Sequence, residues 1–251
     1  MTIRGILAGA ACALLFVVLA WGFHAMPAFG HYPGPYGAVI DSAVAQERHL
    51  PNAISAVNFD YRGVDTLGEE FILFVAVAGI TMVLRFDRER TTDDPLPAKH
   101  GRPPSMRSEA VKLFSIAGVG LTIAFCTYLG IHPHLTPGGG FQGAAMLAGF
   151  TALVFVGLGF DAFRRIAPQS ANETAEAIGA GAYVVIGLAT MAIAGTFLAN
   201  VLPLGGEGEF FSAGTIPLIN FFVGLEVVAG FVLMFLEFAN ETRIEAPEPK
   251  A

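Results

Sequence analysis

The stretch His132-Pro-His-Leu-Thr-Pro-Gly-Gly-Gly-Phe-Gln-Gly-Ala144 separates two apolar runs in the middle of this chain. At its centre stand Pro137, Gly138, Gly139, Gly140, Phe141 and, after one glutamine, Gly143. Each glycine costs a helix roughly 1 kcal/mol relative to alanine, so three in a row predict that the helix breaks here. Two interpretations follow: a tight contact or re-entry point between the flanking helices, or a flexible turn.

The composition on either side of this break is that of a membrane protein. The 251 residues are 54% hydrophobic and 14% charged, with a mean hydropathy of +0.60, which excludes an ordinary soluble domain. About 20 apolar residues cross the hydrocarbon core as a helix. Segments of that length lie at about 5–23, 67–84, 110–131, 141–160, 177–199 and 214–236. The sequence predicts an all-α polytopic protein with about six transmembrane helices.

The positions of lysine and arginine predict the orientation. With a cytoplasmic amino terminus, 12 of the 14 basic residues lie inside and only Arg48 and Arg62 lie outside. We therefore expect both termini in the cytoplasm, at the inner (plasma) membrane. Arg4 followed by an apolar run resembles a signal peptide, but the run continues to Phe23, which favours an uncleaved first helix.

The most polar stretch divides the chain into modules. Four prolines fall within residues 85–107, which indicates a cytoplasmic linker. The expected organisation is a two-helix module at 1–84, a linker at 85–109, a four-helix domain at 110–238 and a tail at 239–251. Before the second helix, residues 52–63 alternate apolar and polar side chains. This piece is either amphipathic and lies along the membrane surface, or a plain loop.

Glu226 is the strongest functional candidate, because it falls near the centre of the last apolar segment. A carboxylate facing lipid there would cost several kcal/mol, so Glu226 must face protein or water. Asn220 is a weak candidate for the same polar surface, since six residues place it about 120° away on a helix. We expect Glu226 to be the only deeply placed charge.

Two further carboxylates, Asp65 and Glu69, share one face at the start of the second helix, and Glu70 is adjacent. Such a pair at a membrane boundary is suited to bind a cation or to pass protons inward. The alternative is that the pair stabilises the helix amino terminus, where the helix dipole favours negative charge. Both roles are compatible.

No metal site or cofactor is predicted. Cys12 and Cys126 lie in separate apolar segments without clustered partners, which favours small buried side chains over a disulfide or an iron-sulfur site. His132 and His134 flank a proline, and a single His-x-His pair is more often interfacial than metal-ligating.

The shortage of buried charge argues against a self-contained transporter. An independent pump or exchanger would carry several ionisable groups through the membrane interior, often including lysine. Small residues four apart, such as Gly139 with Gly143 and Gly195 with Ala199, favour close helix packing. The chain is therefore expected to be part of a larger translocating assembly.

Three stretches of sequence carry a family resemblance. Residues 134–143 (His-Leu-Thr-Pro-Gly-Gly-Gly-Phe-Gln-Gly), 202–205 (Leu-Pro-Leu-Gly) and 212–227 resemble the MnhB (MrpB) family, one of the membrane components of multisubunit, Mrp-type Na+/H+ antiporters. They also resemble the matching component of membrane-bound hydrogenases. The resemblance covers about 110–238. Residues 58–69 (Asn-Phe-Asp-Tyr-Arg-Gly-Val-Asp-Thr-Leu-Gly-Glu) look like the carboxyl-terminal segment of the large antiporter component, which resembles MbhE of the hydrogenases.

The chain departs from this family pattern in three places. The segment that contains residues 58–69 is fused to the MnhB-like region. This fusion favours a hydrogenase-like or respiratory assembly. Ala144 stands where a further glycine is common. The family also tolerates other residues at the position of Glu226.

The resemblance implies a transporter component rather than an enzyme, with any redox centre in other chains. Its partners would be other membrane subunits, Na+ or H+, and lipid, but no nucleic acid. From their positions in the sequence, Asp65, Glu69 and Glu226 are the candidates for the ion path. The Pro137–Gly143 break would shape a helix contact near this path. The alternative is a purely structural role in assembly of the complex.

Overall fold

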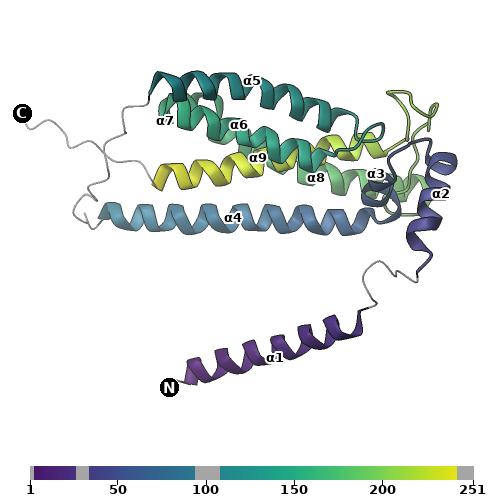
Figure 1. The fold of residues 1–251 in the computed structure, drawn as a ribbon, viewed down its shortest axis with the longest axis horizontal. Coiled ribbons are helices and arrows are strands. Elements are labelled where there is room, and N and C mark those ends of the chain that lie inside the picture. The colour runs from purple at the N-terminus through teal and green to yellow at the C-terminus, as the bar shows by residue number, and fades with distance from the viewer. Residues whose placement is uncertain (1–2, 27–33, 94–107, 242–251) are drawn as a thin grey trace, which may run out of the picture. The chain divides into compact units, whose positions relative to one another are not determined.

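The computed structural model describes residues 3–26, 34–93 and 108–241, and this part of the chain is helical without strands. Ten elements follow one another in Figure 1. They are α1 (Ile3–Ala25), α2 (Tyr36–Arg48), α3 (Ala53–Ala56), the π-helix η1 (Val57–Tyr61), α4 (Gly63–Asp93), α5 (Glu109–Ile131), α6 (Gly140–Leu158), α7 (Phe160–Ile166), α8 (Gln169–Ala194) and α9 (Ile216–Glu241). The predicted all-α polytopic fold is confirmed.

Five of the described helices are long and apolar enough to cross a membrane. These spans are Gly63–Leu84, Glu109–Ile131, Gly140–Leu158, Gln169–Ala194 and Ile216–Asn240, and α1 contains a shorter apolar stretch, Gly9–Ala25. The chain divides into two units, residues 1–39 and 40–251. In the first unit, α1 exposes Phe16 and Trp21 along its length. Most of the predicted linker, at 94–107, and most of the tail, at 242–251, lie outside the described residues.

Two predicted segments change their boundaries. The apolar run at 141–160 contains a break, because Gly159 adopts φ 99° between α6 and α7. Helix α8 begins at Gln169 rather than 177, and it ends at Ala194 because Gly195 adopts the left-handed conformation at φ 76°. Hydropathy missed the polar first turns of α8, which are nevertheless helical, and this shift brings Glu176 into the helix.

The second unit is built around α9. Figure 1 shows α4, α5, α6, α8 and α9 side by side, and α9 packs against each of the other four. Its buried side chains include Ile219, Val223 and Val227 in one core cluster and Val232 and Leu236 in another. Lipid tails are as apolar as leucine, so close packing and hydrogen bonds must supply most of the preference for this arrangement.

The segment before α4 belongs to this core. Residues 52–61 form α3 and η1, and they bury Ser55, Ala56 and Phe59. Asn52 caps α3 and donates to the carbonyl of Pro133 at 2.6 Å, and the Ser55 hydroxyl donates to the same carbonyl at 2.8 Å. The plain loop expected as one alternative is wrong, because the piece is helical and fixed to the 132–136 loop.

Both basic residues placed outside by the sequence are paired. Arg48 forms an ion pair with Asp60 and lies over the Tyr61 ring, 5.1 Å from its centroid. Burial and the hydrogen bond to Glu47 raise the pKa of Tyr61 to about 12. Arg62 pairs with Asp65 on the surface, where such a pair is worth about 0–1 kcal/mol.

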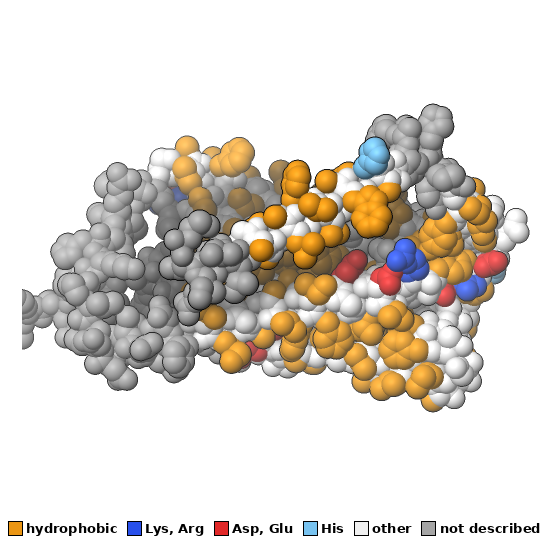
Figure 2. All heavy atoms as spheres, turned by 90° about the horizontal axis from the view of Figure 1, so that it is seen from below, with side chains coloured by type: hydrophobic (Ala, Val, Ile, Leu, Met, Phe, Trp, Pro, Cys, Tyr) orange, Lys and Arg blue, Asp and Glu red, His pale blue; other side chains and the backbone are white. Residues whose placement is uncertain are grey.

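Apolar side chains dominate much of the surface. Figure 2 shows them spread along the helices, whereas most of the visible charged side chains lie toward the end that holds α2 and α3. Ile72, Met82, Phe114, Leu121 and Ile193 are each more than two-thirds exposed. Faces of this kind suit lipid or further membrane subunits.

Candidate ion-translocation site

At the glycine break, the backbones of α5 and α6 are in close contact. Gly138 adopts φ 150°, and a Cβ atom placed on it would lie 2.7 Å from the Leu129 carbonyl oxygen. A Cβ on Gly143 would lie 2.9 Å from the backbone of Gly130 and from the Cys126 carbonyl. Side chains at these positions would separate the two helices, so the break is a tight interhelical contact.

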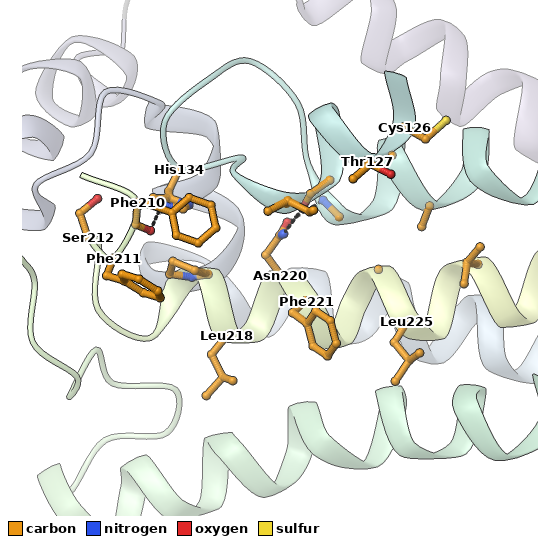
Figure 3. A pocket seen from close by; sticks show the side chains of 18 of the residues that line it. Cys126, Thr127, His134, Phe210, Phe211, Ser212, Leu218, Asn220, Phe221 and Leu225 are labelled. Carbon is orange, nitrogen blue, oxygen red and sulfur yellow. Dashed lines mark hydrogen bonds between the residues drawn. The ribbon is translucent and has the colours of Figure 1, made fainter. Parts of the chain in front are cut away.

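Asn220 ties this break to α9. Its Oδ1 accepts from the backbone N–H of Gly140 at 2.5 Å, and its Nδ2 donates to the carbonyl of Gly130 at 3.0 Å. Figure 3 shows the amide pointing from α9 toward the break. One side chain thus satisfies the first turn of α6 and the last turn of α5, where helix ends leave backbone groups unpaired. Asn220 does not extend a polar surface with Glu226.

Replacing Asn220 is expected to destabilise the protein. Asn220→Ala leaves one buried N–H and one carbonyl without these partners, at about 1–3 kcal/mol each. We expect a lower thermal unfolding midpoint in detergent, measured by loss of the monodisperse peak on heating. Asn172→Ala is the control, because the Asn172 amide donates to Pro168 on an exposed helix end. Equal midpoints for the two variants would contradict the assigned role of Asn220.

An apolar groove of about 810 Å³ lies beside the break, between α5 and α9 (Figure 3). Cys126, Phe211, Leu218, Phe221 and Leu225 line part of it. His134 reaches its edge, where Nε2 lies 2.9 Å from the Phe210 carbonyl. Burial lowers the pKa of His134, so the neutral ring donates this bond. No carboxylate lines the groove among the described residues, so its wall is unsuited to charge transfer.

The carboxylates at the start of α4 have different surroundings. Asp65 is half exposed and paired with Arg62, whereas Glu69 borders a cavity of about 140 Å³. Glu70 borders the same cavity and is only 1% exposed. The other polar lining comes from Ser55, Asn58, Thr66 and Gln142, and Gly138 and Gly139 form part of the wall. The glycine break and the first turns of α4 therefore enclose one polar space.

Three carboxyl groups are buried where α4, α8 and α9 meet. Glu226 is 0% exposed, Glu70 1% and Glu176 8%. Within the described part of the chain, both oxygens of Glu70 and Glu226 and Oε1 of Glu176 accept no hydrogen bond from another residue type, and the Glu70 and Glu226 carboxyl groups can hydrogen-bond only to each other, which requires a proton on one of them. The Glu226 carboxyl interacts electrostatically with those of Glu70 and Glu176. Buried negative charges this close are unfavourable together unless protons or cations compensate them.

Glycines on the facing helices make room for these side chains. A Cβ on Gly179 of α8 would lie 2.6 Å from the Cβ of Glu226 and 2.7 Å from its backbone nitrogen. A Cβ on Gly230 of α9 would lie 3.3 Å from Oε1 of Glu176 and 3.3 Å from Val77. Glu226 on α9 and Glu176 on α8 therefore each lie against a glycine of the other helix.

The expectation that Glu226 is the only deeply placed charge was wrong. Glu70 and Glu176 are buried beside it, and Glu237 is buried further along α9, where it has an interaction of its own. In the sequence Glu70 stands out only as the neighbour of Glu69. Its spacing from Leu73 and Val77 nevertheless puts all three on one face of the helix, which is a signal that Glu70 faces the interior. Glu176 lay just outside the apolar window, so hydropathy gave no signal for it.

Known proteins resemble this chain in both sequence and structure. Residues 110–233 match the model of a family described as a domain related to the MnhB subunit of Na+/H+ antiporter. The chain is 32% identical over 203 residues to the uncharacterized protein MJ1307 of Methanocaldococcus jannaschii, across 72% of this chain and 74% of that protein.

Two solved complexes contain a chain of similar fold. One is the membrane-bound sulfane sulfur reductase (MBS), an archaeal respiratory membrane complex, with a TM-score of 0.69, 28% identity, and coverage of 94% of this chain and 98% of that one. The other is the Mrp complex from Dietzia sp. DQ12-45-1b, with a TM-score of 0.70 and 22% identity. That match covers 98% of this chain but only 27% of the longer one, and it shows the fold alone.

Proposed function

This chain belongs to the family of proteins related to the MnhB subunit of Na+/H+ antiporters, and we propose that it contributes to coupled translocation of Na+, or another cation, and H+. It is a membrane subunit of the kind found in Mrp-type complexes. In this proposal it has no catalytic centre of its own and works with other membrane subunits. The likeness to a chain of a respiratory complex supports a place in a redox-driven assembly. The family of the chain equally supports a place in a standalone antiporter.

The observation that carries the proposal is the group of buried carboxyl groups on Glu70, Glu176 and Glu226, which have no cation and no donor side chain of another type to compensate them among the described residues. A purely structural subunit gains nothing from three buried carboxyl groups that have only one another for partners, since each one costs stability. Such groups in a membrane interior are typical of ion and proton pathways. The distribution of basic residues supports cytoplasmic termini in the plasma membrane, which puts the cavity beside Glu69 on the outer side.

We propose that Asp65 and Glu69 form the mouth of this path. Glu69 borders the cavity, and Asp65 lies one helical turn nearer the amino terminus of α4. The double variant Asp65→Asn, Glu69→Gln is expected to lower Na+-dependent proton transport several-fold in membrane vesicles that contain the assembled complex. The physical reason is the loss of negative charge that concentrates cations at the mouth.

The exposed-loop variant Glu207→Gln removes one charge away from the cavity and serves as the control. If the double variant transports normally, the two carboxylates only stabilise the start of α4. Assembly is followed by co-purification of the other subunits with the tagged chain. A structural role would instead give variants that fail to assemble, with transport lost in proportion to the complex recovered.

A further inference from the structure

A second polar cavity, of about 610 Å³, lies where α8 begins and α9 ends. Its lining includes Arg164, Gln169, Ser170, Glu173 and Asn240. Glu70 and the first cavity lie near the start of α4, whereas Glu176 lies near the start of α8. Helices α8 and α9 are antiparallel, because Gly179 faces Glu226 and Glu176 faces Gly230. The two polar cavities are therefore at opposite ends of the helices that hold the buried carboxyl groups.

Acidic side chains form a series between the two cavities, in which each member is close enough to the next to interact electrostatically. Glu69 interacts electrostatically with Glu70, and Glu70 with Glu226. Glu226 interacts with Glu176, whose Oε1 lies beside Gly230, one turn further along α9. Glu176 in turn interacts with Glu173, three residues away on α8 and exposed in the second cavity.

We propose that Glu69, Glu70, Glu226, Glu176 and Glu173 form a continuous proton path between the two cavities, and that the ion carried by this chain is H+ rather than Na+. The inference rests on the proposed function and specifies its ion. A carboxylic acid passes its proton to the next carboxylate and is left as a carboxylate that accepts the following proton. The hydrogen bond between the Glu70 and Glu226 carboxyl groups suits such a transfer, and among the described residues no donor of another type binds the oxygens of Glu70 and Glu226 or Oε1 of Glu176.

The arrangement suits a proton better than a metal cation. Hard cations take about six oxygen ligands that converge on one point. Here the carboxyl groups are spaced along the helix axes, and among the described residues no three His, Cys, Asp or Glu side chains are grouped to hold a metal ion. Apolar side chains lie beside two of them, because Val223 lines the cavity that Glu70 borders and Val77 lies next to Gly230, which Oε1 of Glu176 approaches. A proton needs only one titratable group at each step.

The test replaces Glu176 in the complete complex, reconstituted in liposomes and assayed for Na+-driven proton movement. Glu176→Gln removes the titratable group with little change of shape, and Glu176→Met does so with an apolar side chain in case the amide impairs assembly. We expect either variant to lower the maximal rate at least about tenfold. The Na+ concentration that gives half the maximal rate should not change. Thr190→Val is the control, because Thr190 is equally buried on α8 and its hydroxyl bonds only within the helix, to Gly187.

Two results would overturn the inference while leaving the proposed function intact. A several-fold rise in the half-saturating Na+ concentration, with the maximal rate kept, would assign Na+ binding to this row. Normal kinetics in both Glu176 variants, alongside a transport defect in Glu226→Gln, would show that the row does not extend to the second cavity. Normal kinetics in all of these variants would overturn the proposed function itself.

Discussion

Glu226→Gln is expected to lower proton-coupled cation transport by the assembled complex about 100-fold, the effect typical of losing a group that transfers protons. Glu226 stands between Glu70 and Glu176, so its neutral replacement interrupts the series in the middle. Glutamine has nearly the same shape, and it places no charge among the buried side chains of α4, α8 and α9. Assembly should therefore be unchanged or improved.

The measurement is the rate of Na+-driven pH change in vesicles, normalised to the complex recovered on a native gel. Glu226→Asp provides the matched control, since it keeps the titratable group with a shorter side chain, and it should retain part of the activity. Wild-type rates for Glu226→Gln would exclude this residue from the path. A loss of transport that only follows a loss of assembly would favour a structural role.

Gly179→Ala is expected to destabilise the protein strongly. The new Cβ would lie 2.7 Å from the Glu226 nitrogen and 2.8 Å from the Phe222 carbonyl oxygen. Backbone atoms cannot turn aside as a flexible side chain can, so α8 and α9 must move apart. Overpacking of this kind costs about 1–3 kcal/mol or more. We expect a clearly lower thermal midpoint for the purified protein in detergent.

Gly181→Ala is the matched control on the same helix. Within the described part of the chain, a Cβ at Gly181 meets no heavy atom within 4 Å beyond its chain neighbours and the adjacent backbone of α8 itself. Alanine favours a helix over glycine by about 1 kcal/mol, so this variant should be neutral or slightly stabilising. Similar midpoints for the two variants would mean that α8 and α9 do not pack as closely as described.

The spans could be predicted from the sequence because each one depends on a local property. Apolar runs of membrane-crossing length define the helices, and the run from Pro137 to Gly140 marks the break between α5 and α6. Boundaries were less certain where polar residues are helical, as in the first turns of α8. The single apolar run at 141–160 likewise did not reveal that Gly159 ends α6.

The candidate site was only partly predictable, because it depends on which helix faces are turned toward each other. Spacing correctly put Asp65 and Glu69 on one face of α4 but did not show that Glu70 is turned toward α9. Glu226 stood out because its whole surroundings in the sequence are apolar. Glu176 and the amide of Asn220 acquire their positions from partners 50 to 90 residues away, which no local pattern encodes.

The pairing of glutamates with glycines on facing helices has an evolutionary consequence. Gly230 leaves a space that Oε1 of Glu176 fills, and Gly179 leaves one that Glu226 fills. A lineage that enlarges either glycine must shorten or lose the opposing acid, or let the two helices move apart. We therefore expect each glutamate and its glycine to vary together among related proteins, since a change at one position constrains what the other can become.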